Sequence, residues 1–171
     1  MAKLERKAYM TFIDSTFKTS GNPTWFLIGK DFEELTVELN PVTETITNIL
    51  GETSVKDNGY SPEMDADPYY ANTDDAIYEK IKDIAMKRLT GDACKTRILE
   101  VIVEDTDGPT YEAHTENVIV KPQSYGGDTS GFSIPFNVMF DGGRKHGTVA
   151  SLSAPEFTES QSFDFRIGYY L

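Results

Sequence analysis

The sequence predicts a mainly β protein, either a β-sandwich or a partly closed barrel, with one flanking α-helix. Apolar and polar residues alternate through residues 132–140 and again through residues 35–39, which is the period of a strand with one buried face. Clusters of glycine, proline and asparagine separate such segments, as turns do between short strands. A convincing helical period occurs once, in residues 74–90. These three observations favour layered β-sheet covered by a single helix.

Three strands are predicted in the N-terminal part of the chain. Residues 7–14 alternate, residues 25–28 form a short apolar run that ends at Gly29, and residues 35–39 alternate up to Asn40. Glycine and asparagine at these two stops are common turn residues. We therefore expect each segment to be a separate short strand.

Residues 42–60 form a candidate arm. The segment is rich in threonine and β-branched residues, contains several turn residues and carries little apolar core. A stretch with strand propensity and no local burial partner can pair with a neighbouring subunit; a mobile surface hairpin is the alternative. The residues that indicate the arm are Thr43, Thr45, Ile46, Thr47 and Ile49.

An acidic strand is predicted directly after the arm. Glu63, Asp65 and Asp67 share one face of an extended segment, and Met64 and Ala66 share the other. Carboxylates in a row on one strand face repel one another unless that face is well hydrated. The simplest interpretation is a solvated sheet face.

The predicted helix spans about residues 74–90. Asn72 or Thr73 can cap its first turn, and Gly91 can stop it. Its single apolar stripe indicates that it packs against the outside of a sheet. The stripe consists of Ile77, Ile81, Ile84, Ala85 and Leu89.

The C-terminal half is predicted to contain two hairpins and a last strand. Residues 97–104 and 111–121 should pair through an acidic turn. Residues 132–140 should reverse at the Asp-Gly-Gly sequence of residues 141–143 and return as a second strand. Residues 163–169 alternate again and predict a final strand.

Length and charge limit the classes of function. A chain of 171 residues fits one domain, so we expect residues 1–171 to fold as a unit. The 28 acidic and 16 basic residues give a net charge of −12, which opposes sequence-independent binding to DNA phosphates; solubility is the simplest reason for the acidity. No run approaches the roughly 20 apolar residues of a membrane span, so we expect no membrane partner and folding in the cytoplasm.

The sequence offers few groups for chemistry. Cys94 is the only cysteine, so no intrachain disulfide is possible and zinc ligands are too few. Neither His114 nor His146 lies in a nucleophile motif, and no phosphate-binding glycine loop occurs. Residues 105–108 resemble part of a calcium loop, but Val103 replaces its first acidic ligand. We therefore expect a non-enzyme without catalytic residues, cofactor or metal.

Read in order, the chain resembles a known family. The likeness depends on residues 25–29, the alternating residues 35–41, the threonine-rich segment that ends in residues 59–67, the single helix that leads into paired strands, and residues 136–140 with the glycine-rich turn to residues 147–149. This order is similar to that of the major tail proteins, or tail-tube proteins, of tailed bacteriophages that infect Gram-positive bacteria.

The resemblance implies a structural role. Members of the family form hexameric rings that stack into a hollow tail tube, the conduit for DNA ejection. It implies partners as well: other copies of the chain, the tape measure, initiator and terminator proteins and, in a contractile tail, a sheath. The protein would be located in the virion tail, and in the host cytoplasm during assembly. Whether the tail is contractile, non-contractile or a bacteriocin stays open.

Under this resemblance the acidity has a mechanical meaning. Six copies at −12 each give a ring of roughly −72, and a lumen of that sign lets DNA slide without specific binding. Our first expectation for a lumen-facing acidic strand is Glu63, Asp65 and Asp67, and our second is the pair Glu100 and Glu104.

Two other functions stay open. One is a β-sandwich that binds carbohydrate or another ligand, for which Tyr69-Tyr70 and Tyr169-Tyr170 are the neighbouring aromatic pairs. The other is a small hydrolase of unrecognised type.

Overall fold

The computed structural model describes residues 3–29, 32 and 34–160. The described residues are mainly β, with one α-helix and two short 3-10 helices. None of the described helices is long and apolar enough to cross a membrane. The elements in chain order are η1 (Arg6–Ala8), β1 (Tyr9–Asp14), β2 (Trp25–Ile28), β3 (Val37–Glu38), β4 (Pro41–Thr47), β5 (Thr53–Tyr60), β6 (Glu63–Ala66), α1 (Tyr78–Lys87), η2 (Gly91–Cys94), β7 (Lys95–Ile102), β8 (Tyr111–Pro122), β9 (Gly126–Asp128), β10 (Gly131–Ser133), β11 (Phe136–Val149) and β12 (Thr158–Glu159).

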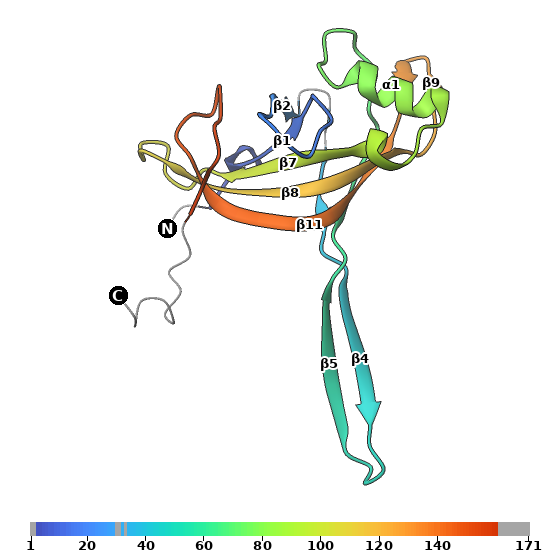
Figure 1. The fold of residues 1–171 in the computed structure, drawn as a ribbon, viewed down its shortest axis with the longest axis vertical. Helices are drawn as coiled ribbons and strands as arrows, with labels where there is room; N and C mark the ends of the chain where they lie inside the picture. The colour runs from blue at the N-terminus through green and yellow to red at the C-terminus, as the bar shows by residue number, and fades with distance from the viewer. Residues whose placement is uncertain (1–2, 30–31, 33, 161–171) are drawn as a thin grey trace.

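One antiparallel sheet organises the molecule. Its strands follow the order β2-β1-β7-β8-β11-β6-β3, and β12 pairs with the far end of β11. The sheet curls into a half-barrel with α1 on one side of it (Figure 1). The predicted fold class, mainly β with one flanking helix, is therefore confirmed.

The main core lies between the sheet and α1. Ile77, Ile81 and Ile84 bury the predicted helix stripe against Ile98 of β7 and Val118 of β8. Each fully buried aliphatic side chain contributes roughly 1.5–3 kcal/mol relative to an exposed one. A second, smaller cluster around Phe12 and Leu99 covers part of the opposite face.

The helix is shorter than the sequence predicts. It begins at Tyr78, and its N-cap is Ile77, which makes no side-chain cap. Asn72 does not cap the helix, because its side-chain oxygen accepts the N–H of Asp74 at 2.9 Å and holds a local turn instead. The helix ends at Arg88, a left-handed residue whose N–H bonds to the carbonyl of Ile84, before it reaches Gly91.

The expected reversal at residues 141–143 is wrong. β11 continues through this sequence as one long strand, and its register against β8 shifts between Phe140 and Gly142 and between Gly142 and Lys145. Gly142 and Gly143 have φ angles of +94° and +69°, so they absorb a bulge that other residues enter only with strain. The strand also begins later than predicted, at Phe136, because Pro135 cannot donate to the ladder.

Other strand boundaries differ from the predicted ones by a few residues. β1 begins at Tyr9 because η1 precedes it, and β3 is reduced to two residues. The predicted pairing of the two strands after the helix is confirmed by β7 and β8. Phe132 is not part of the apolar face predicted for residues 132–140. It lies on β10, which pairs with β9, and is 37% exposed. The strand predicted at residues 163–169 lies outside the described residues.

Candidate functional site

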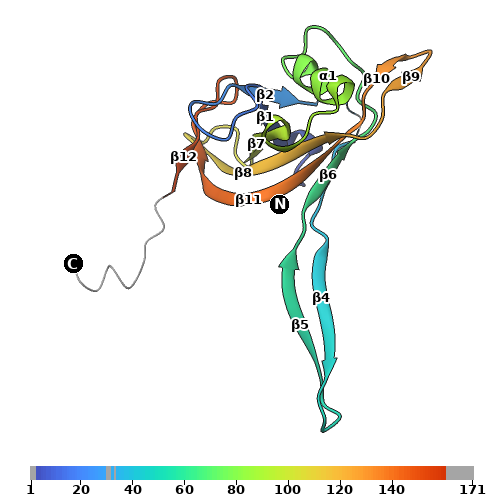
Figure 2. The same cartoon turned by 45° about the vertical axis from the view of Figure 1, so that its right-hand side comes forward.

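A long β-hairpin protrudes from the half-barrel. β4 and β5 pair with each other and extend away from the sheet on the side opposite α1 (Figures 1 and 2). Every residue from 41 to 58 is exposed. The strands predicted for the arm are therefore present, and among the described residues they pair only with each other.

The tip of the hairpin is built by one asparagine. The side-chain oxygen of Asn48 accepts the N–H of Leu50 at 2.9 Å and the N–H of Glu52 at 3.0 Å. Gly51 supplies a φ angle of +82° for the turn. This arrangement holds two apolar side chains in solvent, because Ile49 is 101% and Leu50 78% exposed. The sequence indicated Ile49 but not its neighbour.

The root of the hairpin is tied to the sheet. The N–H of Ser61 donates to the carbonyl of Leu39 at 3.1 Å, and the Asn40 side chain donates back to the Ser61 carbonyl at 3.1 Å. The chain continues on one side into β3 and on the other into β6, which pair with each other. The direction of the arm is thus fixed by two strands of the main sheet.

The acidic strand has the predicted alternation. Met64 and Ala66 are buried in the core, so Glu63, Asp65 and Asp67 lie on the other face. Glu63 is directly opposite Glu38 of β3, a pairing of like charges that is stable only with good hydration. None of the ion pairs found among the described residues includes these side chains. The strand therefore offers uncompensated negative charge.

The structure places the two residues of the second acidic pair, Glu100 and Glu104, in different environments. Glu104 is exposed in the turn after β7, but Glu100 is only 8% exposed. The Glu100 carboxylate accepts hydrogen bonds from the Tyr9 hydroxyl and, at 2.7 Å, from the Arg144 guanidinium. Glu100 therefore has no free carboxylate, because the group is buried and paired with Arg144. Whether this strand face lines a lumen stays a prediction.

The partners of Glu100 form a buried polar cluster. Arg144 leaves the β11 bulge and also contacts Glu116 of β8 at 3.1 Å, while Glu116 accepts the N–H of Gly142 at 3.1 Å. Burial opposes the charge of Arg144, but its two carboxylate partners more than offset this and raise its pKa. Burial, and then the charge of Glu100, raise the pKa of Tyr9. Each group is occupied by another, so we assign the cluster to holding strands together.

The two histidines are brought together by the same strand pair. His114 of β8 is opposite His146 of β11, and their Nδ1 atoms are 2.7 Å apart. Glu112 lies 3.1 Å from Nε2 of His114. The described residues contain no group of three or more His, Cys, Asp or Glu side chains that could hold a metal. Cys94 is buried, and its thiol donates to the Leu89 carbonyl.

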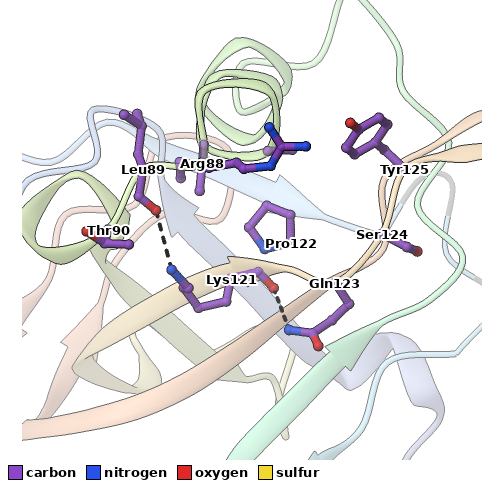
Figure 3. Close-up of a pocket in the computed structure, with 10 residues that line it drawn as sticks. Arg88, Leu89, Thr90, Lys121, Pro122, Gln123, Ser124 and Tyr125 are labelled. Carbon is purple, nitrogen blue, oxygen red and sulfur yellow. Dashed lines mark hydrogen bonds between the residues drawn. The ribbon is translucent and has the colours of Figure 1, made fainter.

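The cavities on the described surface include two that bear on function. The larger, about 710 Å³, lies near the first two strands and is lined in part by Trp25, Arg97, Asn117, Lys145 and Phe157. The smaller, about 320 Å³, lies between the end of α1 and the end of β8 (Figure 3).

The aromatic platform expected for a glycan binder is absent at one of its two positions. Tyr69 is 1% exposed and packs edge-on against Phe136. It is therefore a core residue and cannot stack on a sugar. Tyr169 and Tyr170 lie outside the described residues.

Comparison with known proteins adds no family. No protein-family model matches the chain, and no curated protein matches it. The class of protein is therefore defined by structure: an acidic, single-helix half-barrel with a protruding, fully exposed hairpin.

Proposed function

We propose that the protein is the tail-tube subunit of a tailed bacteriophage, which self-assembles into stacked hexameric rings that conduct DNA during ejection. The observation that carries the proposal is the hairpin of β4 and β5, whose residues 41 to 58 are all exposed. The order of sequence features that resembles the tail-tube family supplies the particular identity.

The hairpin supports assembly on physical grounds. An isolated two-stranded hairpin is marginally stable in water, and its free edges and exposed apolar side chains are a liability for a protein that stays monomeric. Val42, Ile46 and Val55 add to the exposed apolar surface, at 44%, 41% and 70% exposure. Contact with other copies buries this surface and orders the strands, so the arm has a purpose in an oligomer that it lacks in a monomer.

The acidic strand supports a conduit for DNA. Glu63, Asp65 and Asp67 are free of ion pairs within the described residues, as shown above, and the chain as a whole carries −12. If this face lines the lumen, phosphate meets like charge and gains no binding energy from counterion release. DNA then passes without adhering.

A ligand-binding module is the second candidate, and the larger cavity favours it. A volume of about 710 Å³ is in the range of small-molecule sites. Trp25, which lines the cavity, has a buried indole N–H that finds no hydrogen-bond partner among the described residues. A glycan array and a small-molecule thermal-shift screen on the purified protein test this reading directly.

Electron microscopy tests the proposed function. The purified protein should form rings or hollow tubes as its concentration rises, and high salt should promote stacking because it screens repulsion between acidic copies. Negative-stain images across concentration and salt, with light scattering alongside, measure this. A protein that stays monomeric under all these conditions, and that binds a ligand in the screens, would overturn the proposal in favour of the second candidate.

Charge reversal on the acidic strand tests its position. Lysine at Glu63, Asp65 and Asp67 should leave assembly intact, because these side chains point away from the core, but should impair DNA passage by adding phosphate contacts. The measurement is the infectivity of phage whose own tail gene is replaced by the variant. A matched variant with lysine at Asp74, Glu79 and Glu156, all exposed elsewhere, should keep infectivity. Full infectivity of the first variant would remove this strand from the lumen.

A further inference from the structure

The hairpin tip and the smaller cavity are complementary in polarity. Ile49 and Leu50 are held outward by the Asn48 turn, and the described residues leave both side chains largely uncovered. Burying two such side chains contributes several kcal/mol to association, at roughly 1.5–3 kcal/mol each. An apolar surface that could bury this tip would therefore stabilise association.

The smaller cavity has the lining that such a tip requires. Ile84, Ala85 and Leu89 of the α1 end form one wall, and Pro122 after β8 forms another. Tyr125, 49% exposed, is the aromatic side chain at its edge (Figure 3). A cavity of about 150 Å³ holds benzene, so the 320 Å³ here are sufficient for two aliphatic side chains.

The charges match as well. The charged residues that line the cavity are Arg88 and Lys121, and no acidic side chain is found among its described lining residues. In a chain of net charge −12 such a basic edge is unusual. Residues 42–60 carry three acidic residues and one lysine, a net charge of −2. Glu52 follows the apolar tip by two residues and is the acidic residue nearest to it in sequence.

The tip cannot reach the cavity of its own chain. In two views turned about the long axis, the hairpin extends to one end of the molecule while α1 lies at the other (Figures 1 and 2). A contact between tip and cavity must therefore join two copies. When two copies join head to tail, the pair keeps one free tip and one free cavity, so this heterologous contact can repeat along a line.

We propose that the cavity at the end of α1 receives the Ile49–Leu50 tip of a second copy, with Glu52 facing Arg88. The proposal rests on the assembly function and specifies which surface accepts the arm. It makes the hairpin a longitudinal connector, because tip and cavity lie at opposite ends of the subunit.

Two variants isolate the two halves of the contact. The tip variant carries Ile49→Asp and Leu50→Asp, and the cavity variant carries Ala85→Trp and Arg88→Glu. Each should raise the concentration needed for assembly at least about tenfold. Ser54→Asp, on the same hairpin but away from the tip and outside its apolar surface, and Lys87→Glu, beside the cavity, are the matched controls and should assemble normally. Cooperative thermal melts confirm that every variant is folded.

Mixing the variants is the decisive experiment. The tip variant keeps its cavity and the cavity variant keeps its tip, so in an equimolar mixture each cavity variant should join one tip variant. Longitudinal growth should stop at that pair, measured by analytical ultracentrifugation. The charge swap Glu52→Arg with Arg88→Glu in one chain should recover assembly that each single change weakens.

Two results would overturn the contact. A tip variant that forms tubes like the wild type would show that the tip is not buried, while the tube function stands. A mixture that stays monomeric, with both variants folded, would show that tip and cavity do not meet. If the wild type forms no tubes but the mixture dimerises, the contact holds and the tube function fails.

Discussion

Deleting the hairpin is expected to abolish assembly and to leave a folded monomer. The variant joins Pro41 to Gly59 and removes residues 42–58, all of which are exposed. Pro41 and Tyr60 are partners in the ladder, so the chain ends to be joined are already close. No residue of either buried cluster is removed, and the unfolding free energy should change by no more than about 1 kcal/mol. Thermal melting and light scattering measure the two effects.

A second variant separates the hairpin's structure from its length. Replacing residues 42–58 with a glycine-serine linker of equal length keeps the connection between β3 and β6 but removes strand propensity and the apolar tip. It should also stay monomeric. Loss of the cooperative melt in the deletion variant would mean that the hairpin belongs to the folding unit, and tubes formed by either variant would contradict an assembly role for the arm.

Most of the fold could be predicted from the local spacing of apolar and polar residues. The core buries one face of the helix, at Ile77, Ile81 and Ile84, and one face of the strand around Met64. The spacing of apolar residues in the sequence shows both faces directly. The arm could be predicted for the opposite reason, because residues 42–60 have strand propensity without apolar spacing.

The β11 bulge could not be predicted from local pattern. An Asp-Gly-Gly sequence after an alternating strand is a strong turn signal, and the same glycines also suit a bulge. What decides between them is the pairing of β11 with β8 on both sides of the break. That pairing depends on contacts between residues far apart in the chain, which a local pattern does not contain.

The polar clusters and the cavity were missed for the same reason. Arg144 meets Glu100 and Glu116 only because β7, β8 and β11 are neighbours in the sheet. The sequence offers Glu100 together with Glu104 as a candidate acidic face, since acidic residues are rarely buried without a partner. Glu100 can be buried because Arg144 of β11, which lies 44 residues later in the chain, forms an ion pair with it.

Removing Arg97 is expected to cause the largest loss of stability from a single substitution. Its guanidinium donates to the Asp14 carboxylate from Nε at 3.1 Å and from Nη2 at 2.8 Å. The Asp14 side chain is 0% exposed, and its other oxygen accepts from Thr16 and Thr24. Arg97→Met leaves this carboxylate buried without its counter-charge, which costs about 3–5 kcal/mol. In a chain of this size, the melting temperature should fall by roughly 6–20 °C.

A double-mutant cycle tests whether the loss comes from the stranded charge. Asp14→Asn combined with Arg97→Met should destabilise the protein by clearly less than the sum of the two single changes, because no unpaired charge is left in the core. Lys95→Met is the matched control: this lysine is on the same strand but 39% exposed in its ion pair with Asp92, and its loss should cost less than about 1 kcal/mol. Additive single effects, measured by chemical denaturation, would mean that Arg97 stabilises through its bonds to the carbonyls of Gly21 and Ser20. The loss of the Asp14 ion pair would then not be the source of the destabilisation.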